Sequence, residues 1–165
     1  MKKLLCLCAF ITVALVAVAC APSSLWKSDP TAKQIQNEYF DAELLPFSIM
    51  AGYIGFDLTI RNKTTNRLKV DWNKTFYLYD GKRNGGFTFE DTALTDRNKP
   101  KPPDIVAGNA TFSKKIYPSN LFELSVIAGA PLHGEMKAGE NGVYLTVIAG
   151  GKEIAETLTF HFVKQ

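Results

Sequence analysis

The two histidines are the first residues of this sequence to consider for acid–base chemistry. His133 lies in the segment APLHGEM, two residues before Glu135. An imidazole beside a carboxylate can act as a general base, so a hydrolase site at His133 is one hypothesis. His161 lies in TFHFV between two phenylalanines, and we expect it on the water-facing side of a strand.

The sequence lacks the common signatures of catalysis. It contains no G-x-S-x-G, no H-E-x-x-H, no glycine loop that could cradle a phosphate and no EF-hand pattern. Two histidines are also too few for a typical catalytic zinc site. We therefore expect a protein that is not an enzyme and has no metal site and no cofactor, and we keep the hydrolase at His133 as an alternative.

Tyr77 and Tyr79 alternate with Phe76 and Leu78 in the segment TFYLYD. The alternation predicts a strand whose apolar residues face a core and whose tyrosines face outward. A flat pair of aromatic rings could bind sugars, which predicts a glycan- or peptidoglycan-binding module. The alternative is that a neighbouring loop covers both tyrosines.

Three cations, Arg97, Lys99 and Lys101, are spaced two residues apart in the long irregular stretch 90–104. The prolines of this stretch favour an extended, partly polyproline-like chain from which the three side chains project. They could contact an anionic partner such as a lipid headgroup or an acidic protein face. The alternative is a solvated loop whose prolines prevent edge-strand pairing.

Charge and cysteine content exclude several classes of protein. The formal net charge is +3, and the chain is close to neutral without Lys2 and Lys3. Nucleic-acid binding needs a far more basic surface, so we expect no nucleic-acid partner. All three cysteines lie within the first twenty residues, so the remaining chain has neither a disulfide framework nor a thiolate metal site.

The N-terminal stretch has the organisation of an export signal. Lys2 and Lys3 form a positive region. The apolar run 4–19 that follows has the length of a signal peptide and is too short to span a bilayer comfortably. The run ends in small residues and a cysteine, Ala17-Val18-Ala19-Cys20.

This ending resembles the lipobox of bacterial lipoproteins. The resemblance implies that residues 1–19 are removed and that the sulfur of Cys20 carries a diacylglycerol in thioether linkage. Ala17 stands where that family commonly has leucine, and an ordinary secretory signal cleaved near AVACA is the alternative. By the same resemblance, Ala21 in place of aspartate favours the outer membrane over the inner one if the host is Gram-negative.

Residues 20–38 are predicted to carry the lipid, a tether and a short helix. The segment APSSLWKSD contains proline and serines, which argues against regular structure up to about Asp29. Asp29 is a suitable N-cap and Pro30 a suitable first residue for a helix of about two turns. Trp26 could lie at the membrane interface or pack against the end of the domain.

Alternating apolar and polar residues dominate the remaining chain, 39–165. Such strict period two is typical of half-buried strands. Eight segments are expected to form strands: 55–62, 67–72, 75–80, 86–90, 110–118, 121–128, 142–149 and 152–163. We expect the first two to form a hairpin through the turn residues NKTTN, and the last two to form one through Gly150-Gly151.

About eight short strands and no convincing long helix predict an all-β domain, an antiparallel immunoglobulin-like β-sandwich. A small closed barrel is the alternative. The stretch LTIRNKTTNRLKVDWN also resembles a segment of uncharacterised bacterial lipoproteins with such a domain, which implies fold and export but no activity. The Asn-x-Thr triplets at Asn62, Asn73 and Asn109 are interpreted as turn chemistry.

These observations together predict a lipid-anchored protein of the cell envelope that acts as a non-catalytic interaction or structural module. The lipid on Cys20 would hold the sandwich near the bilayer, and loops or sheet edges would contact an envelope protein. Glycan binding through Tyr77 and Tyr79, and hydrolysis at His133, are the alternatives.

Overall fold

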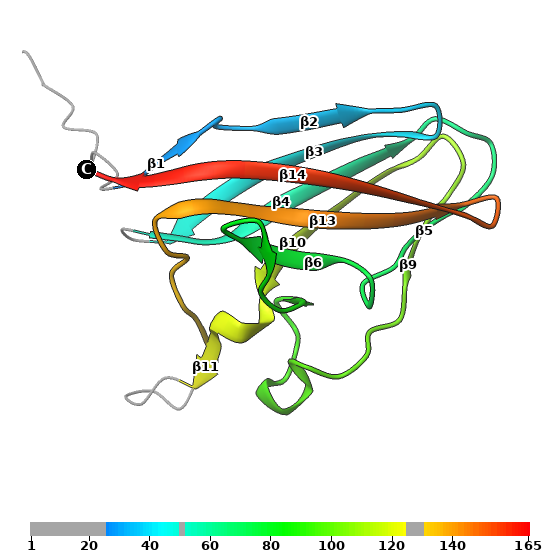
Figure 1. Cartoon of the computed structure of the whole chain (residues 1–165). Helices are drawn as coiled ribbons and strands as arrows, with labels where there is room; N and C mark the ends of the chain where they lie inside the picture. The colour runs from blue at the N-terminus through cyan, green and yellow to red at the C-terminus, as the bar shows by residue number, and fades with distance from the viewer. Residues whose placement is uncertain (1–25, 50–51, 125–130) are drawn as a thin grey trace, which may run out of the picture.

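The computed structural model describes residues 26–49, 52–124 and 131–165. Over these ranges the chain forms fourteen strands, arranged in antiparallel sheets of seven, five and two strands. The two larger sheets pack face to face (Figure 1). This arrangement confirms the predicted all-β, immunoglobulin-like antiparallel sandwich. The expected signal peptide, 1–19, and Cys20 lie outside the described residues.

The seven-stranded sheet is built around one long hairpin. Its strands are β1 (Trp26–Asp29), β14 (Lys152–Lys164), β13 (Gly139–Ala149), β5 (Leu68–Val70), β9 (Asp104–Val106), β6 (Phe76–Tyr79) and β7 (Lys82–Arg83). They follow the order β1-β14-β13-β5-β9, while β6 pairs with another part of β13 and with β7. The predicted hairpin of β13 and β14 is confirmed, and Gly150 and Gly151 at its turn have φ of 56° and 85°.

The five-stranded sheet faces this hairpin. Its order is β2 (Lys33–Gln36), β3 (Phe40–Ile49), β4 (Gly52–Asn62), β10 (Thr111–Pro118) and β8 (Phe87–Thr88). The remaining elements are the pair β11 (Phe122–Leu124) and β12 (Pro131–His133) and two 3-10 turns, η1 (Leu94–Asp96) and η2 (Ser119–Leu121). The eight predicted segments correspond to β4, β5, β6, β8, β10, β11, β13 and β14.

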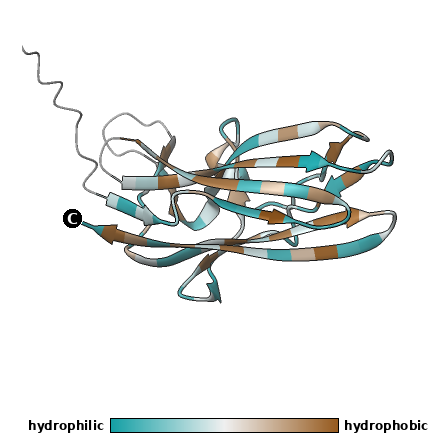
Figure 2. Cartoon of the chain, turned by 90° about the horizontal axis from the view of Figure 1, so that it is seen from above, coloured by the Kyte–Doolittle hydropathy of each residue, from teal (hydrophilic) through white to brown (hydrophobic). Residues whose placement is uncertain are grey.

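Period-two patterning places every second side chain between the sheets, and apolar and polar colours alternate along the strands in Figure 2. The predicted core positions of β14, Leu158, Phe160 and Phe162, are buried. His161 between the last two is exposed, as expected. The same alternation that predicts the strands therefore also predicts which face of β14 meets the core.

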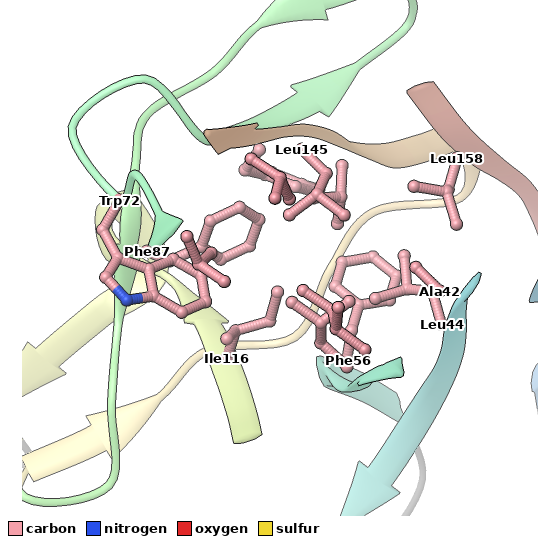
Figure 3. Close-up of a cluster of buried hydrophobic side chains, with 14 of the residues drawn as sticks. Ala42, Leu44, Phe56, Trp72, Phe87, Ile116, Leu145 and Leu158 are labelled. Carbon is pink, nitrogen blue, oxygen red and sulfur yellow. The ribbon is translucent and has the colours of Figure 1, made fainter. Parts of the chain in front are cut away.

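The interior consists of apolar side chains from both sheets (Figure 3). Leu145 and Leu158 of the long hairpin lie across from Ala42, Leu44 and Phe56 of the five-stranded sheet. All five are buried. Burying a leucine or phenylalanine side chain contributes about 1.5–3 kcal/mol, so this apolar layer is the main stabilising force in a domain whose described residues contain no cysteine.

The predicted hairpin between segments 55–62 and 67–72 is wrong. β4 pairs with β3 and β10, whereas β5 pairs with β9 and β13, so the two strands belong to opposite sheets. The NKTTN turn carries the chain from one sheet to the other. Turn residues predict a change of direction, but whether the next strand pairs with its neighbour or crosses over depends on the whole sandwich.

The buried side chain of Asn62 holds this crossover. Its Nδ2 donates to the carbonyl oxygens of Asn66, Val106 and Ala107 at 2.7, 3.2 and 2.9 Å. Its Oδ1 accepts from both the backbone N–H and the hydroxyl of Thr64 at 2.9 Å. The interpretation of this triplet as turn chemistry is confirmed, and the amide also ties the turn to the chain leaving β9.

The predicted short helix after Asp29 is also wrong, and so is a tether that extends to Asp29. The segment instead forms β1, which pairs with the end of β14, and β2, which pairs with β3. Trp26 lies opposite Lys164 and belongs to the hydrophobic core, with 8% of its surface exposed. Pairing with two sheets outweighs a local capping signal, and Trp26 packs against the domain.

Six short or irregular strands were not predicted from the sequence: β1, β2, β3, β7, β9 and β12. The longest of them, β3, does show period two, because Phe40, Ala42 and Leu44 are buried whereas Asp41 and Glu43 between them are partly exposed. The others have two to four residues. Such lengths are too short for periodicity to be visible.

Asn62→Ala should lower the free energy of unfolding by about 2–4 kcal/mol, because three carbonyls and an N–H lose their partner in a partly buried turn. Urea denaturation followed by tryptophan fluorescence measures this loss. Asn98→Ala, in an exposed loop, is the control and should change stability by less than about 0.5 kcal/mol. Equal effects of the two substitutions would contradict the role assigned to Asn62.

Candidate functional site

Tyr77 does not face outward as predicted. It is 1% exposed, and its hydroxyl donates to Oδ1 of the buried Asn141. Burial raises the pKa of Tyr77 well above its usual range. Tyr79 is partly buried against the core, and its hydroxyl donates to the carbonyl of Ala138 at 3.0 Å. The pair therefore does not form the aromatic platform expected for glycan binding.

The outward face of β6 carries Phe76 instead. Its ring stacks on Tyr144 of β13 at 6.1 Å between centroids, and the guanidinium carbon of Arg83 lies 3.5 Å from its centre. The sequence F-Y-L-Y is apolar on both faces, so alternation cannot decide which pair is buried. Asn141 decides it, because it gives the hydroxyl of Tyr77 a partner inside the sandwich.

An open groove of about 520 Å³ lies beside Phe76. We call it the basic groove. Its lining residues are Trp72, Asn73, Phe76, Arg83, Gly85, Gly86, Phe87, Arg97, Asn98, Lys99, Pro100, Lys101, Ser119 and Asn120. They include all three cations predicted from the sequence, one further cation, Arg83, and no carboxylate.

The loop that carries the predicted cations is held in place by hydrogen bonds. Asn73 pairs with the backbone of Lys101 through both ends of its amide, at 2.8 and 2.9 Å. The Nη1 of Arg97 donates to the carbonyl of Phe122 at 2.7 Å. The prediction that all three side chains project from an extended segment is wrong for Arg97, which is anchored and only partly exposed.

The three cations of this loop differ in their surroundings. The ammonium of Lys101 donates to the carbonyls of Arg97 and Lys99 at 2.9 and 3.3 Å, and burial lowers its pKa. Lys99 forms a salt bridge of 2.6 Å with Asp96, which holds the pKa of that carboxyl below its usual range. Of the three loop cations only Lys99 forms a salt bridge, and its partner Asp96 does not line the groove, so a negatively charged ligand would meet mostly unpaired positive charges.

The floor of the basic groove at Trp72 is held by contacts with residues outside the groove. The indole Nε1 of Trp72 donates to Oδ2 of Asp104 at 2.9 Å, and the ammonium of Lys114 lies 2.6 Å from the same oxygen. Trp72 is buried, and its ring packs edge-on against Phe89. These contacts give the groove a rigid floor, so a ligand would bind to a largely preformed surface.

His133 lies in an aromatic stack and does not line the basic groove. Its ring is stacked on Tyr117 and Phe122, with centroids 3.7 and 4.7 Å apart. Its Nδ1 is buried without a hydrogen-bond partner, and Glu135 lies over Gly52. No hydrogen bond to a carboxylate orients the imidazole in the described structure, so the hydrolase hypothesis gains no support here.

Two further properties concern the described residues only. They contain no group of three or more histidine, cysteine, aspartate or glutamate side chains placed to hold a metal ion. Within the same ranges, no helix has the length and apolar character that crossing a membrane requires. No protein-family model matches the chain, and a comparison with curated proteins gives no match.

Arg83 is the lining cation that sequence reasoning missed. It reaches the groove because Asp80 and Gly81, with φ of 48° and 70°, close a two-residue turn that pairs Leu78 with Arg83. The Asp-Gly signal was visible in the sequence. Extending the hairpin by two residues past this turn would have placed Arg83 opposite Leu78, on the same face as Leu78 and Phe76.

His133→Phe should preserve the aromatic stack and remove a buried nitrogen without a partner. We expect stability at neutral pH to rise by about 1 kcal/mol. Burial lowers the pKa of His133, although Glu90 opposes the shift. The unfolded chain therefore binds a proton more tightly, and wild-type stability should fall as pH drops below about 6.5, toward the lowered pKa.

The measurement is urea denaturation at several pH values from neutral to mildly acidic. His133→Phe should show less acid destabilisation than the wild type. His161→Gln is the matched control, since it removes an exposed histidine and leaves the stack intact. An unchanged acid dependence in His133→Phe would contradict this account.

Proposed function

We propose that this protein is a lipid-anchored module of the cell envelope that binds an acidic segment of a partner protein in the basic groove, without catalysis. The single observation that carries the binding role is the groove itself, which four cations line and no carboxylate does. Complementary charge of this kind steers an acidic partner and fixes its orientation.

The arrangement of the cations supports a peptide-sized anionic partner. Arg83 and Lys99 are exposed, whereas Arg97 and Lys101 are partly buried and held by backbone carbonyls. A guanidinium has five N–H donors, and the bond to Phe122 uses one nitrogen of Arg97, so further donors remain for a carboxylate. Several positive groups on a fixed surface suit a chain with several carboxylates.

The location rests on the sequence around Cys20. The lipobox-like ending implies a thioether-linked lipid, and Ala21 favours the outer membrane in a Gram-negative host. Two or three acyl chains are sufficient for stable anchoring. In this proposal the lipid keeps the sandwich at the membrane, and the basic groove recruits the partner there.

Binding of a fluorescent oligoglutamate peptide to the full-length lipoprotein in detergent tests the groove. The double substitution Arg83→Gln and Lys99→Gln should weaken binding about tenfold, because each exposed charge pair is worth up to about 1 kcal/mol. Fluorescence anisotropy measures the affinity. Raising the salt concentration from about 0.05 to about 0.3 M should also weaken wild-type binding, because exposed charges are screened.

Lys82→Gln is the matched control, because Lys82 is the exposed neighbour of Arg83 in β7 and does not line the groove. It should retain wild-type affinity within about twofold. Equal loss in both variants would reject the groove as the binding site. Tighter binding of polygalacturonate than of oligoglutamate would indicate that the partner is an acidic glycan and not a protein.

The anchor has its own test, which is independent of the groove. Mass spectrometry of the protein purified from its host membranes should show Cys20 as the first residue, with a diacylglycerol on its sulfur. The Cys20→Ala variant should no longer be found in the membrane fraction, as measured by sedimentation and immunoblotting. An unmodified Cys20 in the membrane-derived protein would reject the anchor.

A further inference from the structure

Five large hydrophobic side chains are strongly exposed in the described part of the chain: Leu45, Ile49, Ile105, Leu132 and Val163. Three of these, Ile49, Leu132 and Val163, come from segments that are far apart in the sequence. The contacts described below place the segments that carry these three side chains at the end of the sandwich where β14 ends. Their exposed fractions are 56%, 55% and 41%.

Ile49 and Leu132 are linked through the beginning of β4. Ile49 is the last residue of β3 and pairs with Gly52. The side chain of Glu135 lies directly over Gly52, and the N–H of Met136 donates to the carbonyl of Tyr53 at 2.7 Å. The segment that continues from Leu132 therefore runs beside the end of the β3–β4 pair.

Val163 is linked to the same place by an aromatic stack. The ring of Tyr53 stacks on Phe162 at 4.4 Å between centroids, and Val163 is the next residue of β14. Val163 also lies opposite Lys27 of β1. Figure 1 shows β1 and the C-terminal end of β14 together at this end of the molecule.

The chain that precedes the described residues joins the sandwich at this same end. Trp26 is the first described residue and pairs with Lys164. Cys20 lies six residues earlier, so a fully extended chain can separate it from Trp26 by at most about 20 Å. The thirteen residues of β14 extend about 40 Å toward the opposite end. A lipid on Cys20 therefore keeps the apolar end, and not the opposite one, within reach of the bilayer.

The charges around this end are mixed. Lys27, Lys137 and Lys164 are exposed, and so are Glu123 and Glu135. Because opposite charges are present together, a net attraction to anionic lipid does not account for the surface. Its distinguishing property is the three apolar side chains, which suit the interface of a bilayer, where hydrocarbon is accessible below the headgroups.

We propose that Ile49, Leu132 and Val163 form a bilayer-contacting tip that orients the sandwich end-on against the membrane, an inference that rests on the proposed lipid on Cys20. The lipid supplies the attachment, and the tip sets the orientation. This contact leaves the opposite end, at Gly150 and Gly151, pointing away from the membrane.

Spin-label accessibility tests this orientation. Ile49→Cys, Leu132→Cys and Val163→Cys are made in the full-length lipoprotein, isolated from membranes and reconstituted in phosphatidylcholine vesicles, with a nitroxide on the new thiol. The three labels should shift toward oxygen accessibility and away from a water-soluble nickel complex. Ile105→Cys is the matched control, because Ile105 is 49% exposed and β9 pairs with β5, which pairs with β13 beside the Gly150 turn. Its label should remain accessible to nickel.

The possible failures are distinguishable. Labels at 49, 132 and 163 that are as accessible to nickel as the control, in protein whose Cys20 carries lipid, would overturn the tip and leave the anchor intact. Spin–spin broadening between molecules at these positions would overturn it in favour of contact with a second copy. An unmodified Cys20 would overturn both proposals, since the tip depends on the anchor. A stronger nickel protection in anionic than in zwitterionic vesicles would show that charge, and not the apolar tip, sets the orientation.

Discussion

The buried amide of Asn62 links the two sheets of this domain at their crossover. Asn62 stands where the chain leaves the five-stranded sheet, and it also bonds the segment where the chain leaves β9 to return to that sheet. The two crossovers are packed so closely that a Cβ on Gly108 would lie 2.1 Å from the carbonyl oxygen of Thr65. The position of one sheet relative to the other therefore depends on a junction in which the backbone has little room to shift.

The basic groove depends on this junction and on the core behind it. Its loop leaves β8 in one sheet and returns as β9 in the other, so both sheets have to be in place before the cations converge. Within the loop, backbone groups are satisfied by side chains, notably Asn73 and Arg97, in place of strand pairing. These bonds give a long irregular segment a fixed shape, and they restrict the motion of its charged side chains Arg97 and Lys101.

Local alternation in the sequence was sufficient to predict the fold class, eight of the strands and the buried face of β14. It failed where the deciding partner is distant in sequence. The burial of Tyr77 depends on Asn141, the absence of a helix after Asp29 depends on pairing with β14, and the crossover at Asn62 depends on β9. The three predicted cations do line one groove. Predicting that Arg83 joins them would have required knowing how the tight turn at Asp80-Gly81 sets the pairing of β6 with β7.

The pairing of β1 with the last strand has a mechanical consequence. A load transmitted through a lipid on Cys20 would reach the folded domain at Trp26, which pairs with the terminal residues of β14. Pulling at Trp26 would load the backbone hydrogen bonds of β1 one after another. A strand that opens in this way resists force only weakly, because each bond bears the load alone. The indole of Trp26, which is buried in the core, would hold this edge strand in place against such a load.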